Sequence, residues 1–154
     1  MSLITIPKKI YIVASDAEGS TPINAFDACL VKAGLPQVSL VKVTSILPRE
    51  VEIIKHPPRL PDGANVPAIY TYTTSDIVND LISAAIVVAF TDGVTLVAEY
   101  SGRTSRREAE NYAKAIAEEM ARMRELSITK IIIRSASHKV RKVGCVLALV
   151  AEVG

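Results

Sequence analysis

Short apolar runs separated by turn-forming residues dominate the chain, and this pattern is typical of a β-rich fold. Thr21 and Pro22 are the residue types that begin a helix, and that helix should end near Ala33. Residues 49–55 fit either a strand or one turn of helix. The pattern predicts strands over 8–14, 38–45, 68–73, 82–90, 94–100, 128–136 and 142–153.

Two of these predicted strands indicate how the interior is packed. Residues 82–90 (ISAAIVVAF) are almost wholly apolar, as expected for a strand that is covered on both faces. The Asp-Gly pair at 92–93 predicts a two-residue hairpin turn, after which residues 94–100 pair back on the first strand. That register places Glu99 opposite Ile86, in apolar surroundings.

A longer amphipathic segment at 104–126 predicts the second helix, with Thr104 or Ser105 as its N-cap. Its apolar stripe consists of Ala109, Tyr112, Ala113, Ile116, Met120 and Met123. The last two strands are expected to form a closing hairpin with a basic turn at 137–142 (SHKVRK). The order of elements predicts an α/β fold, specifically a layered α-β-β-α sandwich with mainly antiparallel sheets, as one domain over 1–154.

Composition narrows the class of protein. The formal net charge of +2 over 154 residues gives no general reason to expect a nucleic-acid or membrane partner. The longest uncharged apolar stretches, 81–91 and 143–151, are far shorter than the roughly 20 residues of a membrane-spanning helix. The N-terminus lacks a signal-peptide pattern, so we expect a cytoplasmic protein. Cys29 and Cys145 are interpreted as small buried hydrophobic residues.

Two further classes of site receive little support. His56 and His138 lie in predicted turns without the spacing of a metal site, so we expect no metal. Nucleic-acid binding by the basic cluster near the last turn is an alternative, but the cluster is short, lacks interleaved aromatic residues and is better explained as a solvated turn. Its members are Arg134, His138, Lys139, Arg141 and Lys142.

The segment most informative about chemistry is 42–48, KVTSILP. A Thr-Ser pair at the end of an apolar strand, followed at once by Ile-Leu-Pro, is unusual for a plain turn. Together with its surroundings this segment resembles the pyruvoyl-dependent arginine decarboxylase family, and the resemblance covers nearly the whole chain. No single piece is specific, but the ordered set is: the Glu18-Gly19 loop, NAFDACLVKAG (24–34), KVTSILP (42–48), LPDGANVPAIY (60–70), ISAAI (82–86) and GVTLVAEY (93–100).

The resemblance implies a self-processing lyase. The Ser45 hydroxyl would attack the Thr44 carbonyl, the chain would split between the two residues, and Ser45 would become a covalent pyruvoyl cofactor. This group would convert L-arginine to agmatine and carbon dioxide through a Schiff base, in polyamine biosynthesis. Glu99 matches the family's general acid, and its expected burial would raise its pKa toward neutrality. Asp27 matches the aspartate that binds the substrate guanidinium with two parallel hydrogen bonds.

Two residues depart from the family's pattern, and they leave alternatives open. Thr44 stands where serine is common, and Ser39 stands where asparagine is common. Six extended residues span roughly 20 Å, so Ser39 and Ser45 cannot meet within one straight strand. Their cooperation would cross a subunit boundary, in agreement with the homotrimers, or multiples of trimers, that the family implies. The alternatives are a decarboxylase of another amino acid, such as histidine or lysine, and an uncleaved, inactive homologue with a structural or regulatory role.

Overall fold

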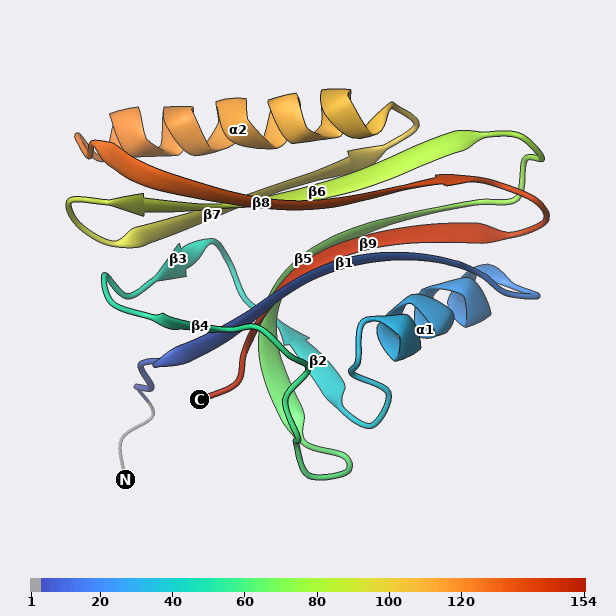
Figure 1. The fold of residues 1–154 in the computed structure, drawn as a ribbon, viewed down its shortest axis with the longest axis horizontal. Coiled ribbons are helices and arrows are strands. Elements are labelled where there is room, and N and C mark those ends of the chain that lie inside the picture. The colour runs from blue at the N-terminus through green and yellow to red at the C-terminus, as the bar shows by residue number, and fades with distance from the viewer. Residues whose placement is uncertain (1–3) are drawn as a thin grey trace.

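The computed structural model describes residues 4–154 as two stacked β-sheets with one helix on each outer face (Figure 1). The five-stranded sheet has the order β2-β5-β9-β1-β4, and the four-stranded sheet has the order β3-β7-β6-β8. The predicted α-β-β-α sandwich is therefore confirmed. Its elements are β1 (Lys9–Glu18), α1 (Pro22–Lys32), β2 (Ser39–Lys42), β3 (Ile46–Leu47), β4 (Glu52–Ile54), β5 (Asn65–Ser75), β6 (Leu81–Thr91), β7 (Thr95–Gly102), α2 (Arg106–Met123), β8 (Ile128–Lys139) and β9 (Gly144–Glu152).

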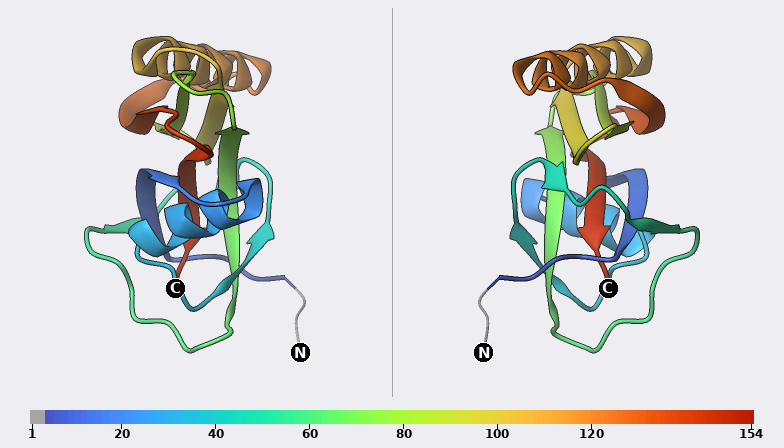
Figure 2. Two further views of the ribbon diagram at one scale, coloured as in Figure 1. Left: turned by 90° about the vertical axis from the view of Figure 1, so that its right-hand side faces the viewer. Right: turned by 90° about the vertical axis from the view of Figure 1, so that its left-hand side faces the viewer.

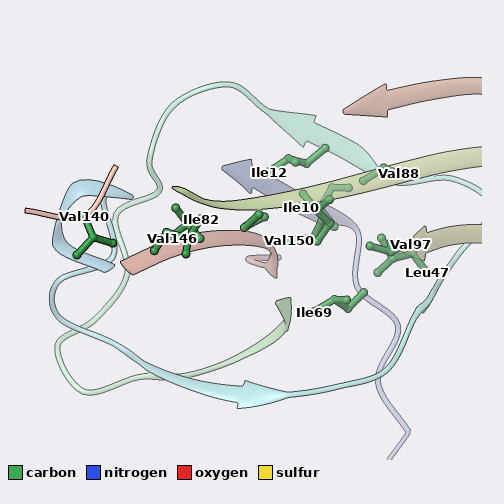
Figure 3. Close-up of a cluster of buried hydrophobic side chains, with 13 residues drawn as sticks. Ile10, Ile12, Leu47, Ile69, Ile82, Val88, Val97, Val140, Val146 and Val150 are labelled. Carbon is green, nitrogen blue, oxygen red and sulfur yellow. The ribbon is translucent and has the colours of Figure 1, made fainter. Parts of the chain in front are cut away.

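The end-on views show the four stacked layers of backbone (Figure 2). Three apolar layers of side chains hold them together. The central layer lies between the two sheets and consists of aliphatic side chains, among them Leu47, Ile69 and Val97 (Figure 3). A second layer lies between α1 and the five-stranded sheet, and a third lies between α2 and the four-stranded sheet. Because β6 and β9 face an apolar layer on each side, both strands are buried along nearly their whole length.

The hairpin of β6 and β7 has the predicted register. Glu99 is the pairing partner of Ile86, and Ala89 is the partner of Leu96. The turn between the strands is fastened by Thr91, whose hydroxyl donates to the Val94 carbonyl and accepts from the Gly93 N–H. The alternation along β7 then turns Val97 and Glu99 toward the five-stranded sheet.

The predicted closing hairpin is wrong. The strand β8 pairs with β6 in the four-stranded sheet, whereas β9 pairs with β1 and β5 in the other sheet. The chain between them crosses from one sheet to the other, and the Val140 N–H donates to the Asp80 carbonyl on the way. His138, predicted in a turn, therefore lies near the end of β8. Alternation shows which residues share a face, but it does not show to which sheet a strand belongs.

The apolar stripe of the second helix was only partly predicted. Ser105, one of the two predicted N-caps, begins α2 and forms a capping box with Glu108. The residues that contact the sheet are small: Ala109, Ala113, Ala117 and Ala121 are buried. The larger members of the predicted stripe, Tyr112, Ile116 and Met123, are 52%, 40% and 74% exposed. Alanine brings the helix backbone close to the sheet, so these three side chains are displaced to the flank, whereas Met120 packs against the apolar layer.

Candidate functional site

The Thr44–Ser45 peptide lies where the chain passes from one sheet to the other. The predicted strand 38–45 ends early, at Lys42, and the chain then enters the four-stranded sheet as β3. Just before the peptide, the Val43 N–H donates to the Ala68 carbonyl at 3.0 Å, in the five-stranded sheet. Just after it, the Ser45 carbonyl accepts from the Val97 N–H at 2.8 Å, in the four-stranded sheet. The peptide is thus held at both ends by different sheets.

Glu99 lies beside this crossing. Ser45 is anchored to Val97, and Glu99 is two residues farther along the same face of β7, which corresponds to about 7 Å of strand. The Glu99 side chain is half-buried, and its Oε2 atom is buried without a hydrogen-bond partner among the described residues. Burial raises the pKa of this carboxyl group, and the positive charge of Lys42 opposes that rise. A carboxyl group of this kind keeps its proton to higher pH than an exposed glutamate and can act as an acid.

Lys42 is a feature of this region that the sequence did not single out. It ends β2, three residues before Ser45, and its Nζ lies 4.7 Å from the centroid of the Tyr70 ring. The Tyr70 ring belongs to a group that also contains Phe26 and Tyr72. The contact with the ring holds the ammonium group on the outer side of the sheet, and its positive charge acts on Glu99. A lysine just before the Thr-Ser pair was the available signal.

Asp27 lies on α1, away from the Ser45 and Glu99 pair. The helix covers the outer face of the five-stranded sheet and contacts β1, β5 and β9, whereas Glu99 is on β7 (Figure 1). Asp27 is exposed and lines an open groove of about 610 Å³ together with Ala17, Glu18, Asn24, Ala28, Val31, Lys32 and Arg141. Phe26 and Leu30 pack against the apolar layer under α1. One chain by itself does not bring Asp27 to Ser45.

Ser39 is also separate from Ser45. It is the first residue of β2, where it is exposed and pairs with Asn65. Thr44 is exposed and Ser45 is half-buried at the other end of the same segment. Both departures from the family's pattern therefore lie on accessible backbone at the edge formed by β2 and β3.

A charged cluster that the sequence did not predict joins the sheets at the far end of β1. The His138 ring is bracketed by two carboxylates, with Nδ1 2.8 Å from Asp16 Oδ2 and Nε2 2.5 Å from Glu18 Oε2. Glu18 also accepts hydrogen bonds from the backbone N–H groups of Arg141, Lys142 and Val143. Burial would raise the Glu18 pKa, but these bonds and the His138 charge lower it to about 2. The cluster therefore fixes the crossing between β8 and β9.

The other predictions concern the two cysteines, membrane-spanning helices and metal sites. Cys29 and Cys145 are both buried, and the Cys29 thiol lies 3.3 Å from the Cys145 carbonyl. Across residues 4–154, no helix combines the length and the apolar character needed to cross a membrane. Within the same part of the chain, no group of three or more His, Cys, Asp or Glu residues is arranged to hold a metal ion.

Comparison with known proteins gives one consistent result. A family model described as pyruvoyl-dependent arginine decarboxylase matches residues 9–152. A protein of that name from Methanocaldococcus jannaschii is 40% identical over 149 residues, which cover 95% of this chain and 90% of the relative. Its namesake from Pyrococcus furiosus is 40% identical, over 92% of this chain and 90% of the relative. A third, from Thermococcus sibiricus, is 36% identical and covers 95% of this chain and 96% of the relative.

Proposed function

The chain belongs to the pyruvoyl-dependent arginine decarboxylase family, and on that premise we propose that it cleaves itself between Thr44 and Ser45 and then converts L-arginine to agmatine and carbon dioxide. The pyruvoyl group formed from Ser45 is its cofactor. The whole of 1–154 acts as one processing and catalytic domain, and we expect it to work in the cytoplasm.

The observation that carries this proposal is the anchoring of the Thr44–Ser45 peptide between the two sheets. The hydrogen bonds of Val43 and Ser45 fix the chain on both sides of the bond to be cut. Cleavage requires the Ser45 hydroxyl to reach the Thr44 carbonyl carbon within the same short segment. A segment that is already held at both ends loses little further conformational freedom when it adopts that geometry.

The residues around the bond suit the chemistry that follows. When formed, the pyruvoyl group supplies a carbonyl that binds the substrate amine and withdraws electrons as carbon dioxide leaves. Glu99 then donates a proton to the substrate carbon that has lost its carboxylate. Its half-buried position raises its pKa and so favours the protonated form that this task needs. Its Oε2 atom, without a hydrogen-bond partner among the described residues, is consistent with a group that serves a reactant.

We further propose that the complete site forms between subunits of a homotrimer or a multiple of trimers. Asp27 would bind the substrate guanidinium, because a carboxylate can accept two parallel hydrogen bonds from that planar group. Asp27 and Ser45 lie on different sides of the five-stranded sheet within one chain, so Asp27 of one copy would complete the site of its neighbour. Ser39, exposed at the start of β2, would contribute across the same boundary.

The departures at Thr44 and Ser39 do not favour an inactive homologue. The attacking hydroxyl belongs to Ser45, which is present, and Thr44 contributes only its carbonyl carbon. The compared relatives all bear the name of the decarboxylase. A preference for histidine or lysine is less compatible with Asp27, since a guanidinium group makes the fullest use of a carboxylate.

Denaturing mass spectrometry of the purified protein tests the proposal directly. Cleavage predicts a 1–44 fragment and a 45–154 fragment with a ketone at its first residue, and the Ser45→Ala chain should remain whole. The cleaved protein should release carbon dioxide from arginine in preference to lysine and histidine. An intact parent mass under all conditions, or equal turnover of the three amino acids, contradicts the proposal.

A further inference from the structure

Cys29 and Cys145 meet between α1 and the middle of the five-stranded sheet. Cys29 lies on the buried side of α1, and Cys145 is the second residue of β9 (Figure 1). Both side chains are fully buried. The Cys29 Sγ atom lies 3.3 Å from the Cys145 carbonyl oxygen, and the two thiols are hydrogen-bonded to each other. The helix can approach β9 closely here because Ala25 and Ala33, on either side of Cys29, carry small buried side chains.

The two cysteines stand on opposite sides of the proposed cleavage between Thr44 and Ser45. Cys29 would belong to the first fragment, together with β1, α1 and β2, and Cys145 would belong to the second fragment, together with the remaining elements. The contact between the thiols would therefore be a contact between the two fragments of the cut chain. The sequence contains no other cysteine, so neither thiol has an alternative partner within the chain.

We propose that Cys29 and Cys145 are a redox site at which a hydroperoxide forms a disulfide that joins the two fragments of the cleaved chain. The Cys29 sulfur attacks one peroxide oxygen, the O–O bond breaks, and the leaving oxygen takes up a proton. The Cys145 sulfur then loses its proton and displaces the oxygen from the resulting sulfenic acid as water. With hydrogen peroxide, the two thiols together lose two electrons and the peroxide is reduced to two molecules of water.

The surroundings of the pair give the two thiols different roles. The hydrogen bond with Cys145 lowers the pKa of the Cys29 thiol, against the opposing effect of burial. The field of Lys32 also lowers this pKa, whereas the field of Asp16 raises it. The same hydrogen bond, together with burial, raises the pKa of Cys145. Cys29 would therefore ionise first and attack the oxidant, because the thiolate is the nucleophilic form, and Cys145 would close the disulfide.

Access of the oxidant to the pair depends on α1. Because both thiols are fully buried, a peroxide reaches them only when the helix moves away from the sheet. The helix has 11 residues and covers the sheet from outside, and opening one short surface helix requires less free energy than unfolding the whole chain. We therefore expect slow oxidation in buffer alone, and faster oxidation in urea at a concentration below the unfolding transition.

The disulfide would keep the helix that carries Asp27 attached to the larger fragment. Asp27 lies two residues before Cys29 on α1, so a bond from Cys29 to β9 holds this part of the helix against the sheet. The reaction of the two thiols does not require a cut chain. The role of the disulfide as a link between fragments rests on the proposed function.

Denaturing mass spectrometry without reductant tests the link in the cleaved parent. After treatment with hydrogen peroxide in low urea, the 1–44 and 45–154 fragments should form one species with the sum of their masses less two hydrogen atoms. A reductant should then separate them. Cys145→Ala, which keeps a small apolar side chain at the buried position, is the matched control and should give separate fragments under all conditions. The comparison of oxidised with reduced parent does not depend on the folding of this variant.

The uncut Ser45→Ala chain tests the same pair without cleavage. Peroxide should lower its mass by two hydrogen atoms and should leave no thiol open to alkylation after denaturation. The midpoint of its urea unfolding should rise and should return to the original value in reductant, because the disulfide restricts the unfolded chain between residues 29 and 145.

The outcomes separate this inference from the proposed function. Fragments of the parent that stay apart after peroxide treatment, with thiols that remain free or are oxidised singly to sulfinic acids, would overturn the inference. Linkage found only between different copies of the chain would overturn it as well. A parent that is never cut but forms the internal disulfide contradicts the proposed function alone. A parent that is cut and releases carbon dioxide from arginine, but whose fragments never become linked, contradicts this inference alone.

Discussion

Replacing Glu18 with glutamine should lower the free energy of unfolding by an amount that depends on pH, because Glu18 on β1 contacts His138 on β8 and so links the two sheets. The folded chain holds the Glu18 pKa at about 2, against an ordinary value of 4.5. Each unit of pKa difference corresponds to about 1.4 kcal/mol, so the ionised carboxylate stabilises the fold by about 3 kcal/mol at neutral pH. The side chain is 17% exposed, and solvent screening lowers the expected value to about 2 kcal/mol.

The pH dependence has a definite direction. Because the folded pKa is depressed, the contribution of Glu18 is complete at pH values well above 4.5 and is lost as the pH falls toward 2. The free energy of unfolding of the parent should therefore exceed that of Glu18→Gln by about 2 kcal/mol at pH 7. Roughly half of this difference should be lost by pH 3.

Urea unfolding of the whole Ser45→Ala chain, with and without Glu18→Gln, measures this difference at a fixed protein concentration. The Ser45→Ala background keeps the polypeptide uncut, so unfolding does not separate two fragments. Glu118→Gln, at an exposed position on α2, is the control and should change the unfolding free energy little at any pH. A difference for Glu18→Gln that is absent at pH 7, or that stays constant down to pH 3, refutes the reasoning.

Three further predictions concern the site and its support. Glu99→Gln should still be cut between residues 44 and 45 but should lose about a hundredfold or more in agmatine formation, and the parent's rate should fall as the pH rises through the elevated Glu99 pKa. Chromatographic assay of agmatine checks both expectations. An uncut Glu99→Gln chain would assign this residue to processing instead. Asp27→Asn should raise KM for arginine by about tenfold to a hundredfold while leaving cleavage unchanged, and an unaltered KM removes Asp27 from the guanidinium site. Ala113→Leu should cost about 1–3 kcal/mol in urea unfolding because Ala113 is buried against the four-stranded sheet, whereas exposed Ala115→Leu should cost little; equal effects contradict the close contact described for α2.

Local pattern predicted the elements of this fold better than their assembly. The register of Glu99 opposite Ile86 was predictable because a two-residue turn leaves only one way to pair the strands. The assignment of β8 and β9 to different sheets was not, because alternation carries no information on which sheet a strand joins. The break between β2 and β3, which places the Thr44–Ser45 peptide between the two sheets, was not predictable for the same reason.

The candidate site, too, was only partly predictable from the sequence. Ser45, Glu99 and Asp27 were identified from the order of motifs, and the first two lie on neighbouring backbone that is joined through Val97. The His138 and Glu18 pair was not foreseen, because 120 residues separate its members and the Glu18-Gly19 motif does not indicate a histidine partner. In the proposed site, Asp27 would reach Ser45 only through contacts between chains, and the sequence pattern of one chain gives no sign of such contacts.

The strand order of the five-stranded sheet also determines whether the two fragments of a cut chain could separate. The strands β1 and β2 precede the Thr44–Ser45 bond, while β4, β5 and β9 follow it, so the two pieces interleave across the sheet. Removing the first fragment would break the pairing of β1 with β9 on one side and with β4 on the other. The hydrogen bonds that anchor the Thr44–Ser45 peptide form only when the chain folds, so folding would have to come before the proposed cleavage. The two fragments would then already be interleaved in one sheet when the reactive group forms at Ser45.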